Sequence, residues 1–78
     1  MDLAIVLDSQ AAIPLYGQLY EELRQAILDG RLSPKQRLPS TRSLAKSLGI
    51  SRITVTQSYE QLIDEGYLQA IAGSGTFV

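Results

Sequence analysis

The stretch STRSLAKSLGISRITVTQSYEQLIDE, residues 40–65, decides how this chain folds. Ser40 and Ser51 are favoured N-cap residues, and each precedes a segment in which apolar residues recur every three or four positions. The apolar positions are Leu44, Ala45 and Leu48 in the first segment and Val55, Tyr59, Leu62 and Ile63 in the second. The pattern predicts two helices, the second over residues 52–65, joined by a short turn at Gly49.

Two helices joined by a short glycine-containing turn form a helix-turn-helix, whose second helix presents its N-terminal residues to bases in the major groove. The candidate residues at this end are Ser51, Arg52, Ile53, Thr54, Thr56 and Gln57. Arg52 can bond a guanine with two hydrogen bonds, and Gln57 can bond an adenine in the same way. The hydroxyl groups can reach bases or phosphates. Alternatively, Ser51 can be a cap alone, and Thr54 and Gln57 can be solvent-facing residues.

The start of the first helix of this pair is a second candidate contact. Ser40, Thr41 and Arg42 stand where a helix offers free N–H groups and its positive dipole end to a phosphate. Lys46 adds a positive charge one turn further along. A purely structural interpretation is also open, with Ser40 as a cap and the two basic residues simply exposed to water.

The flanking sequence completes the predicted architecture. Upstream, Pro14 suits the first turn of a helix, and an apolar stripe predicts that helix over residues 15–29. The tyrosines fall mostly at core spacing. Residues 1–13 are interpreted as an N-terminal arm or a short edge strand, because residues 3–7 are apolar. Downstream, residues 67–71 and 76–78 are β-prone.

A turn over residues 72–75 joins these two β-prone segments into a hairpin. The fold class is therefore α+β, mostly α: a winged helix-turn-helix over residues 14–78, with three helices followed by a C-terminal β-hairpin wing. The slim tip, Gly73, Ser74 and Gly75, can enter the minor groove of DNA, although turn geometry alone explains the glycines equally well.

Charge supports a phosphate-binding surface despite a net charge of −1. Residues 30–59 contain no acid and six of the seven basic residues, so that block carries +6 and the rest carries −7. Such asymmetry is typical of nucleic-acid binding, though a solvated face would show it too. The chain has no cysteine and no histidine, and no catalytic constellation, so we predict that it is not an enzyme. The absence of a signal peptide or a membrane-spanning segment favours the cytoplasm.

Several separated motifs resemble the GntR family of bacterial regulators. They are residues 14–16, 19–20, 30–32, 38–45, 48–52 and 66–68. Residues 58–62 and 73–78 are similar to the MocR/PdxR-like branch of that family. The resemblance covers residues 14–78 and implies a repressor or activator that binds double-stranded operator DNA as a homodimer. It also implies that this chain is an excised N-terminal domain without a cofactor. The missing part would be a large domain resembling fold-type I aminotransferases, which binds pyridoxal phosphate.

The resemblance implies DNA contacts at particular positions. They are Arg42, Ser51, Arg52, Ile53, Thr54, Thr56 and Gly73. Three residues depart from the family pattern. Lys35 replaces a usual glycine, which suggests another turn type or a positive φ. Ile53 replaces a usual polar residue, which suggests apolar contact with a thymine methyl group. Thr56 replaces an arginine common outside this branch.

The leading function is sequence-specific binding of duplex DNA, and the runner-up is a winged-helix protein-interaction module. A partner-binding second helix would expose an aromatic or aliphatic patch, and only Ile53 fits that description. The chain has no long apolar heptad pattern, so we expect it to be a monomer or a weak dimer by itself.

Overall fold

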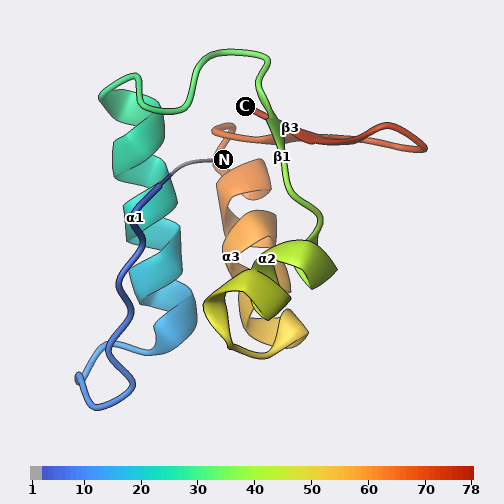
Figure 1. Cartoon of the computed structure of the whole chain (residues 1–78). Coiled ribbons are helices and arrows are strands. Elements are labelled where there is room, and N and C mark those ends of the chain that lie inside the picture. The colour runs from blue at the N-terminus through green and yellow to red at the C-terminus, as the bar shows by residue number, and fades with distance from the viewer. Residues whose placement is uncertain (1–2) are drawn as a thin grey trace.

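Three helices build the fold in the computed structural model, which describes residues 3–78. They are α1 (Leu15–Leu28), α2 (Thr41–Leu48) and α3 (Arg52–Asp64). The predicted helices are confirmed, and α1 and α3 each end one residue earlier than expected because Asp29 and Glu65 are their C-caps. Helix α3 packs against both α1 and α2, as Figure 1 shows.

The helix starts confirm the capping pattern of the sequence. The Ser40 side chain accepts a hydrogen bond from the Ser43 backbone N–H at 3.1 Å, and the Ser51 side chain accepts one from the Thr54 N–H at 3.2 Å. Gly49 ends α2 in the left-handed conformation, with φ of 69°. Because glycine adopts this conformation without a Cβ clash, the chain turns abruptly between α2 and α3.

A three-stranded antiparallel sheet follows the order β1-β3-β2. Its strands are β1 (Arg37–Leu38), β2 (Gln69–Ile71) and β3 (Gly75–Phe77). The predicted hairpin is confirmed as β2 and β3, but the sequence analysis missed β1, which pairs Arg37 with Phe77 and Leu38 with Thr76. Strand β1 has two residues before Pro39, too few for an alternating pattern to be detected.

The predicted first strand also began too early. The backbone N–H groups of Tyr67 and Leu68 donate to the Leu62 carbonyl oxygen, at 2.9 and 3.2 Å. These two residues therefore satisfy an orphan carbonyl at the end of α3, and strand pairing starts only at Gln69. Since this junction is fixed to α3, the hairpin leaves the helical body at a defined place.

The N-terminal segment is an arm and not an edge strand within the described residues 3–13. Leu3, Ile5 and Leu7 are half-buried against the core, whereas the residues between them face solvent. Gln18 of α1 holds the end of the arm. Its amide donates to the backbone carbonyls of Asp8 and Ile13, and its side-chain oxygen accepts from the Asp8 N–H, at 2.7–2.8 Å.

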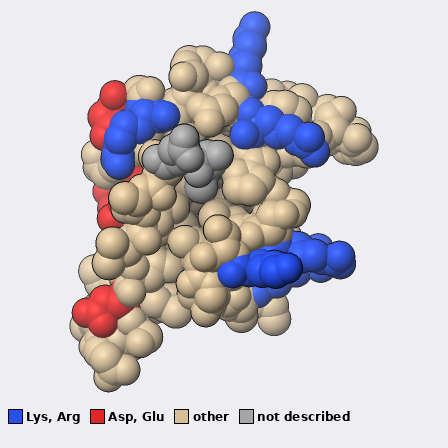
Figure 2. All heavy atoms as spheres, viewed as in Figure 1, with Lys and Arg blue, Asp and Glu red and all other residues tan. Residues whose placement is uncertain are grey.

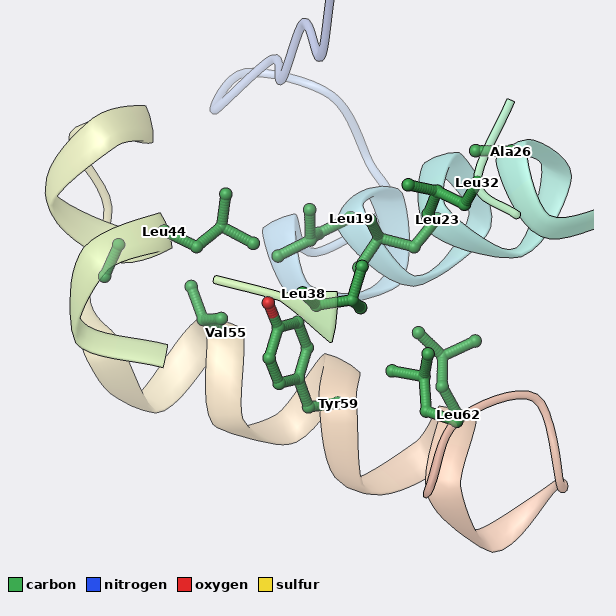
Figure 3. Close-up of a cluster of buried hydrophobic side chains, with 11 residues drawn as sticks. Leu19, Leu23, Ala26, Leu32, Leu38, Leu44, Val55, Tyr59 and Leu62 are labelled. Carbon is green, nitrogen blue, oxygen red and sulfur yellow. The ribbon is translucent and has the colours of Figure 1, made fainter. Parts of the chain in front are cut away.

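One apolar cluster joins all three helices with β1 and the segment before β2 (Figure 3). It consists of Leu19, Leu23, Ala26, Leu32, Leu38, Leu44, Ala45, Val55, Tyr59, Leu62 and Leu68. Tyr59 is buried as predicted, and its hydroxyl donates to the Pro39 carbonyl at 2.7 Å. Burial raises the pKa of Tyr59, which is consistent with a protonated donor. Tyr16, in contrast, is 40% exposed. The core therefore fixes the crossing of α2 and α3, on which the candidate site depends.

A polar network connects α1 to the end of α3. The Tyr20 hydroxyl donates to the Glu65 carboxylate, and this hydrogen bond raises the pKa of Tyr20 to about 12. Arg24 donates to the Tyr67 hydroxyl at 3.2 Å and pairs with Glu21 at 2.9 Å. The network lies beside the junction where the chain leaves α3, so it adds polar support to the start of the wing.

Candidate nucleic-acid interface

The residues at the N-terminal end of α3 that are predicted to read bases differ in exposure and in hydrogen bonding. Arg52, Ile53 and Gln57 are exposed, and Thr54 and Thr56 are half-buried. The Thr54 hydroxyl lies 2.8 Å from the Ser51 hydroxyl. The Thr56 hydroxyl donates to the Arg52 carbonyl at 2.9 Å. Both threonine hydroxyls are thus already engaged within the helix, while the longer polar side chains and Ile53 project from it.

Arg52 links the starts of α2 and α3. Its Nε donates to the Thr41 side-chain oxygen at 3.2 Å. A guanidinium has five N–H donors, so this bond orients the group and leaves further donors for a ligand. The crossing of the two helices therefore brings Thr41 and Arg52, which the sequence analysis assigned to separate roles, into one contact.

Helix α2 contributes basic side chains to the same end of the molecule. Arg42 and Lys46 are exposed and four residues apart, so they share one face of the helix. Ser40 is the cap of α2, as described above, which supports its structural interpretation without removing the free N–H groups that follow it. Within residues 3–78, neither Arg42 nor Lys46 forms an ion pair.

The basic and acidic side chains lie on different sides of the molecule. Figure 2 shows most Lys and Arg atoms projecting to the top and right, and Asp and Glu atoms gathered at the left. The two ion pairs of the described residues, Arg24 with Glu21 and Arg31 with Asp29, involve cations outside α2, α3 and the wing. The cations without an ion pair in residues 3–78 are Lys35, Arg37, Arg42, Lys46 and Arg52.

The wing projects beyond the helices, toward the right in Figure 1. Its tip turns at Gly73, with φ of 77°, and Gly75 has φ of 124°, so both glycines serve the turn geometry. The Ser74 N–H donates to the Ile71 carbonyl at 3.0 Å and closes the turn. Gly73 and Ser74 are exposed, so the tip is slim enough to approach another surface closely.

Two basic residues near the wing were not among the predicted contacts. Arg37 lies in β1, and Lys35 adopts a positive φ of 68°, as its departure from the family pattern suggested. The Lys35 N–H donates to the Val78 carbonyl at 3.1 Å, which fastens this turn to the end of the sheet. The only available sequence signal was membership of the basic block, because a two-residue strand carries no periodic pattern.

The described residues show neither a metal site nor a membrane span. No group of three potential metal-ligating His, Cys, Asp or Glu side chains occurs within residues 3–78. None of α1, α2 and α3 is long and apolar enough to cross a membrane.

A helix-turn-helix with a polar N-terminal end on its second helix, followed by a β-hairpin, defines a winged helix-turn-helix domain. The chain belongs to the GntR family: residues 15–78 match the family described as "Bacterial regulatory proteins, gntR family". Its relatives place it in the MocR/PdxR-like branch. It is the DNA-binding domain of a GntR-family transcription regulator.

Two curated relatives and one solved structure illustrate this similarity. The chain is 51% identical over 74 residues to the probable rhizopine catabolism regulatory protein MocR of Rhizobium meliloti, covering 95% of this chain and 15% of that protein. It is 43% identical over 77 residues to the pyridoxine biosynthesis regulator PdxR of Corynebacterium glutamicum, covering 99% and 17%. The AraR DNA-binding domain in complex with operator ORR3 is 34% identical, with a TM-score of 0.79 and coverage of 94% and 88%.

Proposed function

We propose that this domain reads duplex operator DNA, with α3 in the major groove and the β2–β3 wing at the minor groove. The observation that carries the proposal is the polar end of α3, which meets the start of α2 through Arg52 and Thr41 among cations that have no ion pair within residues 3–78. The similarity to a domain solved with operator DNA supports the same docking mode.

The proposed contacts divide into base reading and backbone anchoring. Arg52, Ile53 and Gln57 project from α3 and read base edges. At the edge of the groove, the Thr56 hydroxyl can accept a hydrogen bond, because its hydrogen is donated to the Arg52 carbonyl, and one hydroxyl of the Ser51–Thr54 pair keeps its hydrogen for donation. Backbone anchoring belongs to Ser40, Thr41, Arg42 and Lys46 on α2 and to the slim tip, Gly73, Ser74 and Gly75, at the minor groove.

A protein-interaction role is less well supported by the exposed surface. Ile53 is 71% exposed and is the one large apolar side chain that α3 exposes in the described structure. The other exposed large apolar side chains lie in other elements: Val6, Ile13, Tyr16, Leu28 and Ile71. A single aliphatic residue among polar neighbours suits a DNA groove better than a docking patch.

The whole protein is a wider proposal, because this chain spans 15% of MocR and 17% of PdxR. We propose that the remainder includes an aminotransferase-like domain that binds pyridoxal phosphate, that the whole protein is a homodimer, and that it acts in the cytoplasm. This chain supplies the DNA-reading part and no catalytic step. Sequencing of the gene beyond this chain tests the proposal, since a different downstream domain would contradict it.

Salt dependence is the direct test of phosphate binding by this domain. If Arg42 and Lys46, which have no ion pair within residues 3–78, contact phosphates, the logarithm of affinity falls with the logarithm of salt concentration by about −0.9 per contact, so these two contacts alone give a slope of roughly −2. Fluorescence anisotropy with a labelled 24-base-pair duplex at several salt concentrations, roughly 50 to 300 mM, measures that slope. An affinity that does not change with salt concentration would contradict the DNA-binding proposal.

Substitution of Arg52 separates base reading from anchoring. Arg52→Ala is expected to lose about 1–3 kcal/mol of discrimination between a selected operator and a scrambled duplex, because a bidentate contact with guanine is removed. Lys46→Ala is expected to weaken both duplexes equally. For each variant, the ratio of the dissociation constants for the scrambled duplex and the operator measures the discrimination. If Arg52→Ala lost the same affinity for both duplexes, Arg52 would be assigned to the DNA backbone and not to a base.

A further inference from the structure

We propose that Arg37 binds a DNA phosphate at the base of the wing, on the stretch of backbone between the groove read by α3 and the groove that faces the wing. This inference rests on the proposed DNA binding and adds a contact that the helix-turn-helix itself does not contain.

The register of the sheet places the Arg37 side chain over β3 of the wing. Arg37 in β1 is opposite Phe77 in β3, and Gly75 lies two residues from Phe77 on the same face of the sheet. The guanidinium lies over Gly75: a Cβ atom built there would be 2.9 Å from the Arg37 Nε and 3.4 Å from its Nη2. Gly75 therefore leaves the space that the guanidinium occupies, in addition to forming the turn.

The same arginine borders a hollow that leads to the start of α2. This hollow has a volume of about 360 Å³ and is lined by Arg37, Leu38, Pro39, Ser40 and Ser43. The Ser40 side chain caps the Ser43 N–H, while the first N–H groups of α2 have no partner within the helix. A backbone phosphate in the hollow would lie beside Arg37 and the positive end of a helix dipole, within reach of a flexible guanidinium.

The charge around Arg37 favours an external anion. Arg37 is exposed and forms no ion pair within residues 3–78. Its neighbours in sequence and across the sheet are Gln36, Leu38, Phe77 and Gly75, none of which is acidic. By contrast, Arg31 already pairs with Asp29 at 3.0 Å. The guanidinium of Arg37 therefore keeps its bidentate donor set available for a phosphate.

The test compares Arg37→Met with Arg31→Met, which removes the same charge from an arginine that is already paired. The probe is a fluorescein-labelled 24-base-pair duplex of fixed sequence. For Arg37→Met we expect about tenfold weaker binding at low salt. We also expect the salt slope to be shallower by about 0.9, because one fewer counterion is released. For Arg31→Met we expect the slope of the unmodified domain.

A purely structural role for Arg37 makes a different prediction. If the guanidinium only supports the wing, Arg37→Met changes the melting temperature and leaves the salt slope of the folded protein unchanged, which would overturn the proposal. A duplex series in which one phosphate at a time is replaced by a neutral methylphosphonate gives a second measurement. We expect one or two positions to weaken the unmodified domain and to have no effect on Arg37→Met.

The two proposals fail in distinguishable ways. If the unmodified domain binds the duplex with a steep salt slope and Arg37→Met binds with the same slope, DNA binding stands and the Arg37 contact is wrong. The same holds if every methylphosphonate position affects both proteins equally. If the unmodified domain shows no salt-dependent binding to the duplex, the proposed function fails first.

Discussion

Two copies of this domain joined through a dimerising partner are expected to bind a two-half-site operator 10²- to 10⁴-fold more tightly than the single domain. One helix-turn-helix reads only a few base pairs, and a two-fold dimer presents two such helices to successive major grooves. Once one copy is bound, binding of the second becomes intramolecular. The single domain is expected to remain near the non-specific range, with a dissociation constant of roughly 10⁻⁴–10⁻⁶ M.

The surface of the domain explains why a single copy is expected to stay monomeric or nearly so. Its exposed large apolar side chains are scattered over the arm, α1, α3 and β2. Among the described residues, Val6 and Ile13 lie in the arm and Leu28 lies at the end of α1, whereas Ile53 and Ile71 lie at the proposed DNA interface. Stable dimers bury a continuous apolar core, which such a scattered set does not supply.

Half-site spacing provides the control for this avidity experiment. An operator is first selected from a random duplex library with the dimerised protein, and five base pairs are then inserted between its half-sites. The insertion turns one half-site by about half a helical turn, so the gain from dimerisation should disappear while the affinity of the single domain stays the same. Light scattering gives the oligomeric state of each protein. A single domain that is a tight dimer with nanomolar operator binding would contradict the prediction.

The parts of the fold that the sequence predicted are those set by local chemistry. Ser40 and Ser51 cap their helices through residues three positions away, and Gly49 forms its turn within the same stretch. These signals need no knowledge of the tertiary structure. The ends of α1 and α3 were each predicted one residue too long, because the last residue satisfies helix-type hydrogen bonds as a cap.

The parts that the sequence missed depend on segments far apart in the chain. Strand β1 exists because Arg37 and Leu38 pair with β3, near the other end of the sequence. The arm has an apolar pattern like a strand, but Gln18 holds it against α1, away from the sheet. In both cases the deciding contact is tertiary, and a short apolar segment does not specify its partner.

The candidate site shows the same division. The sequence could place the proposed reading residues at the start of α3, because the Ser51 cap fixes where that helix begins. The sequence could not show that Thr56 donates its hydroxyl hydrogen to the Arg52 carbonyl or that Arg52 bonds to Thr41. It also gave no reason to separate Arg37 from the rest of the basic block. These details follow from the helix crossing and the strand register.

Leu62→Ala is expected to destabilise the domain by about 2–5 kcal/mol, because a fully buried side chain is removed from the core (Figure 3). A domain of 78 residues has a total stability of only about 4–12 kcal/mol. The melting temperature is therefore expected to fall by about 10–30 °C. Thermal unfolding followed by circular dichroism measures the change.

Leu28→Ala is the matched control, since it makes the same replacement at the last residue of α1, where the side chain is 56% exposed. Leucine and alanine have similar helix propensities, so the difference between the two variants reports burial and not helix formation. We expect Leu28→Ala to change stability by no more than about 0.5 kcal/mol. Equal melting temperatures for the two variants would show that Leu62 is not a core residue. Below its melting transition, Leu62→Ala should retain the salt slope of the unmodified domain, because Leu62 lies in the core and is not among the cations proposed to contact phosphate.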